Sequence, residues 1–264
     1  MRIKVLAENT AKDGFLCEHG LSLYVETDAG RKILFDMGQS DLFAANAEAL
    51  SVDLASVDTA VLSHGHYDHG GGISRFLLDN KTAPVYMSAL AFGEHYNASD
   101  KYIGLDTALS GEKRIVFTDT DISLGDGISL LQGKARTPSE RIDPFGLKIK
   151  RNGALQDEDF LHEQYMLIEE NGKKILFSGC SHRGLFNILD WFSPDIFIGG
   201  FHFTKLDADT PEGRTRLEDC AKRLLALPCT YYTCHCTGVG QYELLREIMQ
   251  DKINYISAGA ELQI

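Results

Sequence analysis

The sequence predicts a layered α/β fold, and three observations indicate it. Short apolar runs alternate with stretches of helical periodicity along nearly the whole chain, a pattern typical of sheets covered by helices. The 264 residues, 44% of them hydrophobic, are sufficient for a large core without disulfides or structural metals. No low-complexity or linker-like segment interrupts the pattern. We therefore expect residues 1–264 to form a single domain.

The expected strands are short runs rich in Val, Ile, Leu, Phe and Tyr, bounded by Gly, Asn or Asp. Asn171-Gly172, between two such runs, predicts a tight β-hairpin. The predicted strands are Ile3–Leu6, Leu21–Glu26, Lys32–Phe35, Thr59–Leu62, Val85–Met87, Ile128–Leu131, Tyr165–Ile168, Lys174–Phe177, Ile196–Ile198, Thr230–Thr233 and Tyr255–Ser257.

The expected helices lie between these strands. The one that begins at Pro211 has the clearest start, because Thr210 can cap it and proline suits the first helical position. Residues 134–164 show little periodicity and predict a long loop, a type of segment that is often functional. The predicted helices are Leu42–Leu50, Ile73–Asp79, Leu90–Tyr96, Leu185–Trp191, Pro211–Leu227 and Gln241–Gln250.

Charge and composition narrow the function. The net charge of −12 disfavours a nucleic-acid-binding protein, which usually needs a basic face, and favours a small-molecule substrate. No apolar run is long enough to cross a membrane, and the N-terminus does not resemble a signal peptide. We therefore expect a cytoplasmic protein whose six cysteines, none in a CxxC pair, are mostly reduced.

Four predicted strands end at a histidine. Apolar runs beginning at Thr59, Ile175, Ile196 and Thr230 lead to His64, His182, His202 and His235, respectively, each in a turn containing Gly, Ser or Cys. A single histidine in a turn is usually structural. In layered α/β folds, however, functional groups gather at the carboxyl ends of strands. The repeated pattern therefore predicts one shared site.

The segment from His64 to His69 carries the sharpest signal. It places His64, His66, Asp68 and His69 within six residues, beside glycines that permit a tight bend. Imidazole and carboxylate groups are ligands for zinc and other first-row metals. This spacing predicts half of a two-metal site that activates water.

This segment, His-x-His-x-Asp-His, resembles the metal-binding motif of the metallo-β-lactamase superfamily and matches it at every ligand position. Asp36, in Phe35-Asp-Met-Gly, resembles the Asp that supports the metal-binding loop in that family. Further segments resemble the subgroup named after dihydropterin-ribofuranosylaminobenzene-phosphate synthase. They are Leu6-Ala-Glu-Asn, Glu18-His-Gly-Leu-Ser, Gly179-Cys-Ser-His-Arg-Gly, Gly200-Phe-His and His235-Cys-Thr-Gly.

The resemblance implies a four-layer αββα sandwich: two mixed sheets face to face, helices outside, and the metals at one sheet edge. It also implies two divalent ions, zinc in the first instance, with manganese and iron as alternatives. We assign the first ion to His64, His66 and His182. We assign the second ion to Asp68, His69 and His235.

Two ligand positions stay open. Where relatives carry a bridging Asp, this chain has Cys180, which is either a thiolate ligand or inert. His162 lies where many relatives carry their third histidine. We prefer His182 because it occupies a Gly-rich turn at the end of a strand, but the spacing alone does not decide between the two.

Substrate contacts are expected from His202 and from the turn that contains Ser181 and Arg183. Free N–H groups at the start of the following helix would attract an anionic group of the substrate. A plain helix cap is an equally simple reading of that turn. His95, expected on a helix, has structural packing as its default role, and the early-loop residues Glu18 and His19 carry less weight.

The predicted function is metal-dependent hydrolysis. Two ions sharing a hydroxide would lower its pKa, while Asp68 orients it and accepts its proton. Esters, thioesters, lactones, amides and phosphodiesters of small molecules all fit. One alternative is a transferase that condenses a pterin precursor with a ribofuranosyl-aminobenzene phosphate. A metal-binding sensor and a redox protein are the remaining alternatives.

Overall fold

The computed structural model describes residues 1–264 and contains two seven-stranded mixed sheets. The first sheet has the strand order β17-β1-β2-β3-β4-β5-β7 and the second β16-β15-β14-β13-β12-β9-β8. The first comprises β1 (Arg2–Ala7), β2 (Ser22–Glu26), β3 (Lys32–Phe35), β4 (Thr59–Val61), β5 (Val85–Ser88), β7 (Ile115–Thr118) and β17 (Glu261–Gln263). The second comprises β8 (Ile122–Gly125), β9 (Ile128–Gln132), β12 (Gln164–Glu170), β13 (Lys173–Ser178), β14 (Ile196–Gly199), β15 (Thr230–Thr233) and β16 (Ile253–Tyr255).

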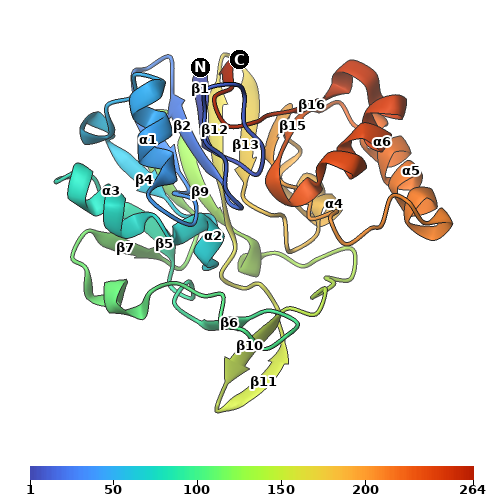
Figure 1. Ribbon diagram of the computed structural model, residues 1–264, viewed down its shortest axis with the longest axis horizontal. Coiled ribbons are helices and arrows are strands. Elements are labelled where there is room, and N and C mark those ends of the chain that lie inside the picture. The colour runs from blue at the N-terminus through green and yellow to red at the C-terminus, as the bar shows by residue number, and fades with distance from the viewer.

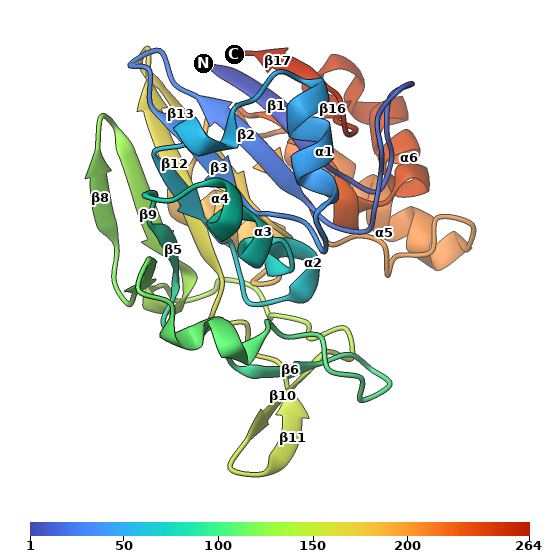
Figure 2. The ribbon, with the colours of Figure 1, turned by 60° about the vertical axis from the view of Figure 1, so that its left-hand side comes forward.

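The two sheets face each other through a shared apolar core (Figures 1 and 2). Ile3 and Phe35 from the first sheet pack in the same cluster as Met166 and Ile198 from the second, all fully buried. Inward-facing apolar side chains from both sheets account for this cluster, as expected for sheets packed face to face.

Helices cover the outer face of each sheet, which completes the four layers. Phe43 and Phe76, on α1 and α3, pack against the first sheet, and Leu189 and Leu217, on α4 and α5, pack against the second. The predicted αββα sandwich is thus confirmed. The helices are α1 (Leu42–Ala49), α2 (Tyr67–Gly70), α3 (Ile73–Asp79), α4 (Leu185–Phe192), α5 (Pro211–Leu225) and α6 (Val239–Met249).

The parallel part of each sheet positions the histidines. Strands β3, β4, β5 and β7 run parallel, as do β13, β14, β15 and β16. Parallel strands bring their carboxyl ends to one edge. The segments that contain His64, His182, His202 and His235 therefore leave the sheets at the ends that the sequence predicts.

Several local predictions are confirmed. Thr210 accepts a hydrogen bond from the Gly213 amide at the start of α5. Asn171 and Gly172 both have positive φ and join β12 to β13 in an antiparallel hairpin. Each of these features depends on local backbone chemistry alone.

The predicted helix Leu90–Tyr96 is wrong. Residues 94–96 form β6 (Glu94–Tyr96), which pairs antiparallel with β10 (Lys148–Arg151). Strand pairing with a segment about fifty residues away overrides local helical preference here. The last strand of the second sheet is also shifted, to Ile253–Tyr255 instead of Tyr255–Ser257.

The expected long loop over residues 134–164 is wrong in part. It contains the hairpin of β10 and β11 (Ala154–Asp157), which with β6 forms a separate three-stranded sheet below the sandwich (Figure 1). Asn152 and Gly153, both with positive φ, make its turn. This is the Asn-Gly signal that also marks the β12–β13 hairpin, but here the flanking strands are too polar to stand out.

No helix of the protein has the length and apolarity that a membrane span requires.

Candidate metal centre

The histidine-rich segment runs from the end of β4 through a tightly packed loop into the short helix α2. Gly65 lies against the turn that contains Ala91: a Cβ atom on Gly65 would lie 2.0 Å from the Ala91 carbonyl oxygen. Only glycine allows such a close approach of two backbones. The loop buries His64 and His66 almost completely.

His64, His66 and His182 form the first ligand group, with one nitrogen of each within 4.8 Å of the others. His64 Nδ1 lies 2.8 Å from Ser63 Oγ, whose proton goes to Asp36, so Nδ1 carries the ring proton and Nε2 keeps its lone pair. Nε2 of His64 and of His66 and both ring nitrogens of His182 are buried without a hydrogen-bond partner. Such orphaned groups call for a ligand, and three imidazoles fit a zinc ion.

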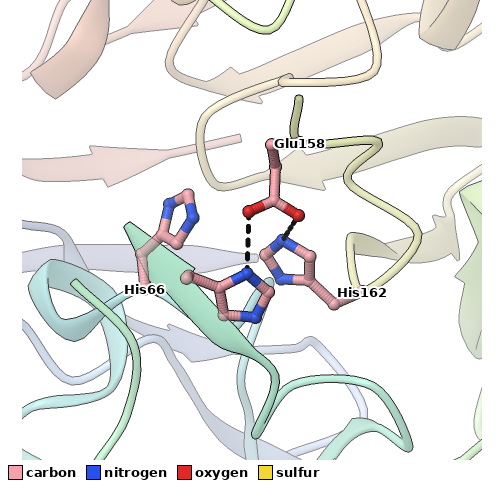
Figure 3. Close-up of side chains that lie close together, drawn as sticks. His66, Glu158 and His162 are labelled. Atoms are coloured by element: carbon pink, nitrogen blue, oxygen red, sulfur yellow. Dashed lines mark hydrogen bonds and ion pairs between the residues drawn. The ribbon is translucent and has the colours of Figure 1, made fainter. Parts of the chain in front are cut away.

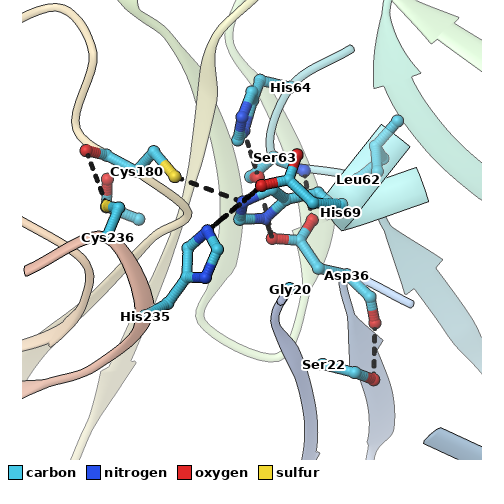
Figure 4. A network of polar contacts seen from close by, with 12 residues as sticks. Gly20, Ser22, Asp36, Leu62, Ser63, His64, His69, Cys180, His235 and Cys236 are labelled. Atoms are coloured by element: carbon cyan, nitrogen blue, oxygen red, sulfur yellow. Dashed lines mark hydrogen bonds and ion pairs between the residues drawn. The ribbon is translucent and has the colours of Figure 1, made fainter. Parts of the chain in front are cut away.

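Asp68, His69 and His235 form a second group, and Figure 4 shows His69 and His235 of this group near His64 of the first. His69 Nδ1 lies 2.7 Å from Asp36 Oδ2 and donates to it, so its Nε2 presents a lone pair. That Nε2 lies 3.3 Å from His235 Nε2 and 3.9 Å from Asp68 Oδ2. His235 Nε2 lies 3.3 Å from the same carboxylate oxygen. The donor set of two imidazoles and one carboxylate also suits zinc.

Asn9 and Glu8 hold His235 in place from the N-terminal segment. His235 Nδ1 donates to Asn9 Oδ1 at 2.7 Å, which leaves Nε2 free. Glu8 Oε1 accepts the backbone N–H of His235 and the hydroxyl of Tyr255. Partners that fix the tautomer and orientation of a ligand histidine are a regular feature of metal sites.

Cys180 lies between the two groups. Its Sγ is 3.2 Å from His69 Nε2, and it clusters with His64 and His69 on one side and with His235 and Cys236 on the other (Figure 4). Burial raises the pKa of the Cys180 thiol well above its usual value. A nearby cation would reverse this preference, because coordination deprotonates a thiol. The Cys180 thiol is therefore close enough to bind an ion in the second group. Without such an ion, burial keeps the thiol protonated.

His162 lies beside the His64–His66–His182 group, with its ring centroid 5.2 Å from that of His66, but its nitrogens face other partners. Its Nδ1 accepts the backbone N–H of Gly65 at 2.7 Å, so its Nε2 carries the proton. That nitrogen faces Glu158, in a cluster with His66 and His95 (Figure 3). Between the two candidates for third ligand, the structure brings His182 to His64 and His66 with its nitrogens free.

The electrostatics of the centre favour neutral imidazoles around an ionised carboxylate. Burial lowers the pKa of His64, of His66 and of His182 well below the usual value. Burial alone would raise the pKa of Asp68, but neighbouring His69 and the contacts with His19 and His235 hold that pKa well below its usual value. Metal ligation requires these protonation states.

His69 differs from the other buried imidazoles. Burial lowers the pKa of His69, but the Asp36 and Asp68 carboxylates outweigh it, so that the pKa of His69 is raised overall. The exposed ring of His19 lies 3.2 Å from Asp68 Oδ2, at the solvent side of the second group. Its neighbour Glu18 instead accepts the backbone N–H groups of Gln39 and Ser40.

A cleft of about 490 Å³ opens beside the first group. His182 and His202 line it, together with Phe145 and the exposed cations Arg141 and Arg216. Burial lowers the pKa of His202 to about 4, so this ring is neutral at pH 7. Its Nδ1 is buried without a partner. The structure thus places His202 where a molecule in the cleft would meet it.

The turn of Ser181 and Arg183 is already engaged within the protein. The backbone N–H groups of His182 and Arg183 donate to the buried carboxylate of Glu163 at 2.7 and 3.0 Å. Ser181 Oγ donates to the Gly200 carbonyl. The Arg183 side chain is buried and does not line the cleft. Glu163 thus binds two N–H groups of the turn itself, whereas Ser181 also lines the cleft beside the start of α4 (Leu185–Phe192).

Four residues that take part in the site were not predicted from the sequence. Glu158 and His95 carried no signal, because their relation to the site depends on the pairing of β6 with β10. Asn9 belongs to a segment that was noted only for a family resemblance, and Glu163 carried no signal. The one local clue is the spacing of Glu158 and His162, four residues apart. Together all nine histidines form a continuous chain of neighbouring rings, with centroids no more than 5.9 Å apart at each step.

Comparison with known proteins agrees with this geometry. The sequence model of the metallo-beta-lactamase superfamily matches residues 17–155. An uncharacterized protein of Methanocaldococcus jannaschii is 31% identical over 211 residues, which cover 76% of this chain and 78% of that protein. The 7,8-dihydropterin-6-methyl-4-(beta-D-ribofuranosyl)-aminobenzene-5'-phosphate synthase of the same organism is 25% identical over 98% of this chain and 95% of its own.

Among solved structures, Tm1679, described as a metal-dependent hydrolase of the beta-lactamase superfamily, superposes with a TM-score of 0.81 at 29% identity. The superposition covers 100% of this chain and 99% of that one. Sequence match, fold and the His-x-His-x-Asp-His loop all agree. The chain belongs to the metallo-β-lactamase superfamily.

Proposed function

We propose that the protein is a metal-dependent hydrolase that holds two divalent ions, zinc in the first instance, and cleaves a small molecule. The observation that carries this proposal is the pair of buried donor groups, His64–His66–His182 and Asp68–His69–His235. The first group has imidazole nitrogens that are buried without hydrogen-bond partners, and the cleft opens beside this group. Esters, thioesters, lactones, amides and phosphodiesters are the bonds that such a centre fits.

The chain's own residues have separable roles in this proposal. Bound ions would supply Lewis acidity and a nucleophilic water at neutral pH. Asp68 Oδ2, close to both His19 and His235, is the oxygen that would orient such a water and accept its proton. His202, neutral and facing the cleft, contributes a hydrogen bond to the substrate rather than a charge.

The test combines zinc content with a hydrolysis panel. Purified protein is reconstituted with zinc, dialysed, and assayed by elemental analysis and with one chromogenic substrate from each bond class. We expect about two zinc ions per chain and turnover of at least one class. Asp68→Asn should lower that turnover by about 100-fold or more.

Glu94→Gln is the matched control, because Glu94 is an exposed carboxylate that pairs with Lys150. It should leave turnover unchanged. Zinc binding without turnover on any class would reject hydrolysis in favour of a sensor. Iron in place of zinc in the protein as purified would point to redox chemistry.

A second candidate is a synthase of the kind that the Methanocaldococcus jannaschii relative is named for. The observation in its favour is the alignment with that enzyme over 98% of this chain. The exposed Arg141 and Arg216 at the cleft add cations that suit a phosphorylated substrate. In this case the metal centre would assist a condensation instead of a hydrolysis.

The two candidates predict different products. The zinc-loaded protein is incubated with a dihydropterin diphosphate and a ribofuranosyl-aminobenzene phosphate, and the mixture is analysed by mass spectrometry. A coupled product with release of diphosphate would support the synthase. Hydrolysis of panel substrates without coupling would support the hydrolase.

A further inference from the structure

The turn that precedes β10 holds a phenylalanine in a backbone conformation that disfavours it. The Leu147 N–H donates to the Pro144 carbonyl at 2.8 Å, and the two residues between them, Phe145 and Gly146, have φ of 49° and 80°. A turn with positive φ at both central positions favours Asn-Gly or Asp-Gly, because a bulky side chain at positive φ is strained. The turn itself therefore gives no reason for a phenylalanine at position 145.

The chain follows this preference elsewhere. Three further turns have a glycine that follows another residue of positive φ, and that residue is Asp or Asn in each: Asp126-Gly127, Asn152-Gly153 and Asn171-Gly172. Phe145 is thus the exception among four turns of the same kind. Strained backbone positions of this sort cluster at functional sites, where the side chain serves something other than the local fold.

The side chain of Phe145 lines the cleft beside the first ligand group. Its ring packs edge-to-face against His202, with 5.0 Å between the ring centroids and 66° between the planes. The His202 ring in turn lies 4.4 Å from the ring of His182. Phe145 is only half-buried. A molecule in contact with its ring would therefore lie next to the candidate metal centre.

The other phenylalanines of the cleft offer less free surface. The Arg223 guanidinium lies 3.4 Å above the centre of the Phe186 ring and covers that face. Phe201 and Phe203 are buried and pack against each other at 5.6 Å. Phe145 is thus the phenylalanine of the cleft that is half-buried and not covered by a cation. Aromatic rings pack best against other rings, stacked with an offset or edge-to-face.

We propose that Phe145 is a specificity-determining residue of the cleft, which packs its ring against a planar ring of the substrate. This inference rests on the proposed function in so far as it takes the cleft as the substrate site. It explains why the chain keeps a phenylalanine where the turn favours Asn. Phe145 then contributes to binding and not to stability, and the substitution Phe145→Asn separates the two contributions.

The choice of probe follows from the charges at the cleft. Arg223 pairs with Glu140, whereas the exposed Arg141 and Arg216 form no ion pair and would attract an anion. The probes are naphthalene-2-sulfonate, which is planar, and its saturated counterpart decahydronaphthalene-2-sulfonate, which is not. Both have the same charge and nearly the same size, so that their difference in Kd reports on the packing of the ring.

Calorimetric titration of the zinc-loaded protein measures both Kd values. Relative to the wild type, Phe145→Asn should weaken naphthalene-2-sulfonate about 5-fold more than it weakens the saturated probe, because only the planar probe loses an aromatic contact. Phe145→Tyr keeps the ring and should keep the ratio of the two Kd values.

Thermal unfolding is the second readout. Phe145→Asn should unfold at the same temperature as the wild type or at a higher one, because Asn suits the turn. Asn152→Phe is the matched control, since it places a phenylalanine at the same position of the exposed β10–β11 turn. This control should lower the unfolding temperature and leave the binding of both probes unchanged.

A ratio of Kd values that stays the same in Phe145→Asn would overturn the proposal, and so would a wild type that does not bind naphthalene-2-sulfonate. An unfolding temperature of Phe145→Asn below that of the wild type would show that Phe145 serves the fold instead. Probe binding requires no turnover. The hydrolysis panel can therefore fail while the preference for a planar ring holds, and the reverse outcome is equally distinct.

Discussion

Asp36 connects the loop after β3 with two residues of the metal centre. It accepts hydrogen bonds from the backbone and side chain of Ser63 and from His69 Nδ1. Its backbone has a positive φ of 59°, a conformation that Asp and Asn tolerate better than most residues. One buried carboxylate thus sets the tautomers of His64 and His69.

Replacing Asp36 by Asn should weaken metal binding. The amide offers one acceptor oxygen where the carboxylate offers two, so the hydrogen bonds to Ser63 and His69 cannot all be kept. We expect zinc affinity at the second group to fall about 10- to 100-fold, measured by competition with a chromogenic chelator. Asp126→Asn is the control, because Asp126 is exposed and has a similar positive φ of 51°. Equal affinities of Asp36→Asn and wild type would contradict the assigned role.

The buried imidazoles predict a pH dependence of stability in the metal-free protein. Burial lowers the pKa of His64, His66 and His182 in the folded state below 6.5, the ordinary value that applies to the unfolded chain. Below pH 6.5 the unfolded chain therefore binds more protons, and the free energy of unfolding falls as the pH falls. The raised pKa of His69 acts in the opposite direction, but it is one histidine against six whose pKa burial lowers.

Urea unfolding in the presence of a chelator, at about pH 7.5 and about pH 5, measures this dependence. We expect a loss of at least about 1.4 kcal/mol per pH unit over the lower part of this range, the amount for one group that stays neutral in the folded state. A stability that is constant or rises toward low pH would show that these rings are not buried as neutral imidazoles. Saturating zinc should make the free energy of unfolding less dependent on pH near neutrality.

At the scale of single elements, the loop after β4 is the most constrained segment. Gly65 approaches Ala91 so closely that Gly65→Ala would force the backbones apart. We expect a loss of stability of about 2 kcal/mol or more together with lost zinc, because the displaced loop carries His64 and His66. Thermal unfolding and zinc content measure the two effects. Gly111→Ala, where an added Cβ meets no atom within 4 Å, should change neither.

The small sheet shows where prediction of elements stops. The sequence predicts most strands of the sandwich because their apolar runs have to be buried on both faces. Strands β6 and β10 carry few apolar residues, and β11 is exposed throughout. Their pairing with one another decides their conformation, so local preference predicted a helix for one and a loop for the others. The histidine and the carboxylate that they position were missed for the same reason.

At the scale of the whole molecule, both ligand groups join the two sheets. His64, His66, Asp68 and His69 follow β4 of the first sheet, whereas His182 and His235 follow β13 and β15 of the second. An ion held by both sets cross-links the sheets at the edge where their loops meet. Binding of the proposed ions would therefore be coupled to folding.

We accordingly expect zinc to stabilise the protein strongly. At a free zinc concentration of about 1,000 times Kd, each ion should add about 4 kcal/mol to the free energy of unfolding. Thermal unfolding with zinc and with a chelator measures the difference. In the His235→Ala variant, zinc should raise the free energy of unfolding only by the contribution of the one ion that remains. An identical unfolding temperature with and without zinc would contradict binding across the sheets.

The sequence by itself determined the layered α/β fold, the family and the His64–His69 loop, because apolar periodicity and a dense local motif are properties of contiguous residues. Only the tertiary structure decided which distant side chains meet. It brought His182 to the first group, bound His162 to Gly65, buried the Ser181–Gly184 turn against Glu163, and joined His95 and Glu158 to His66. These relations depend on how two sheets and a remote hairpin pack, and on which nitrogen of each ring carries the proton. The spacing of residues along the chain predicts neither this packing nor the protonated nitrogen of each ring.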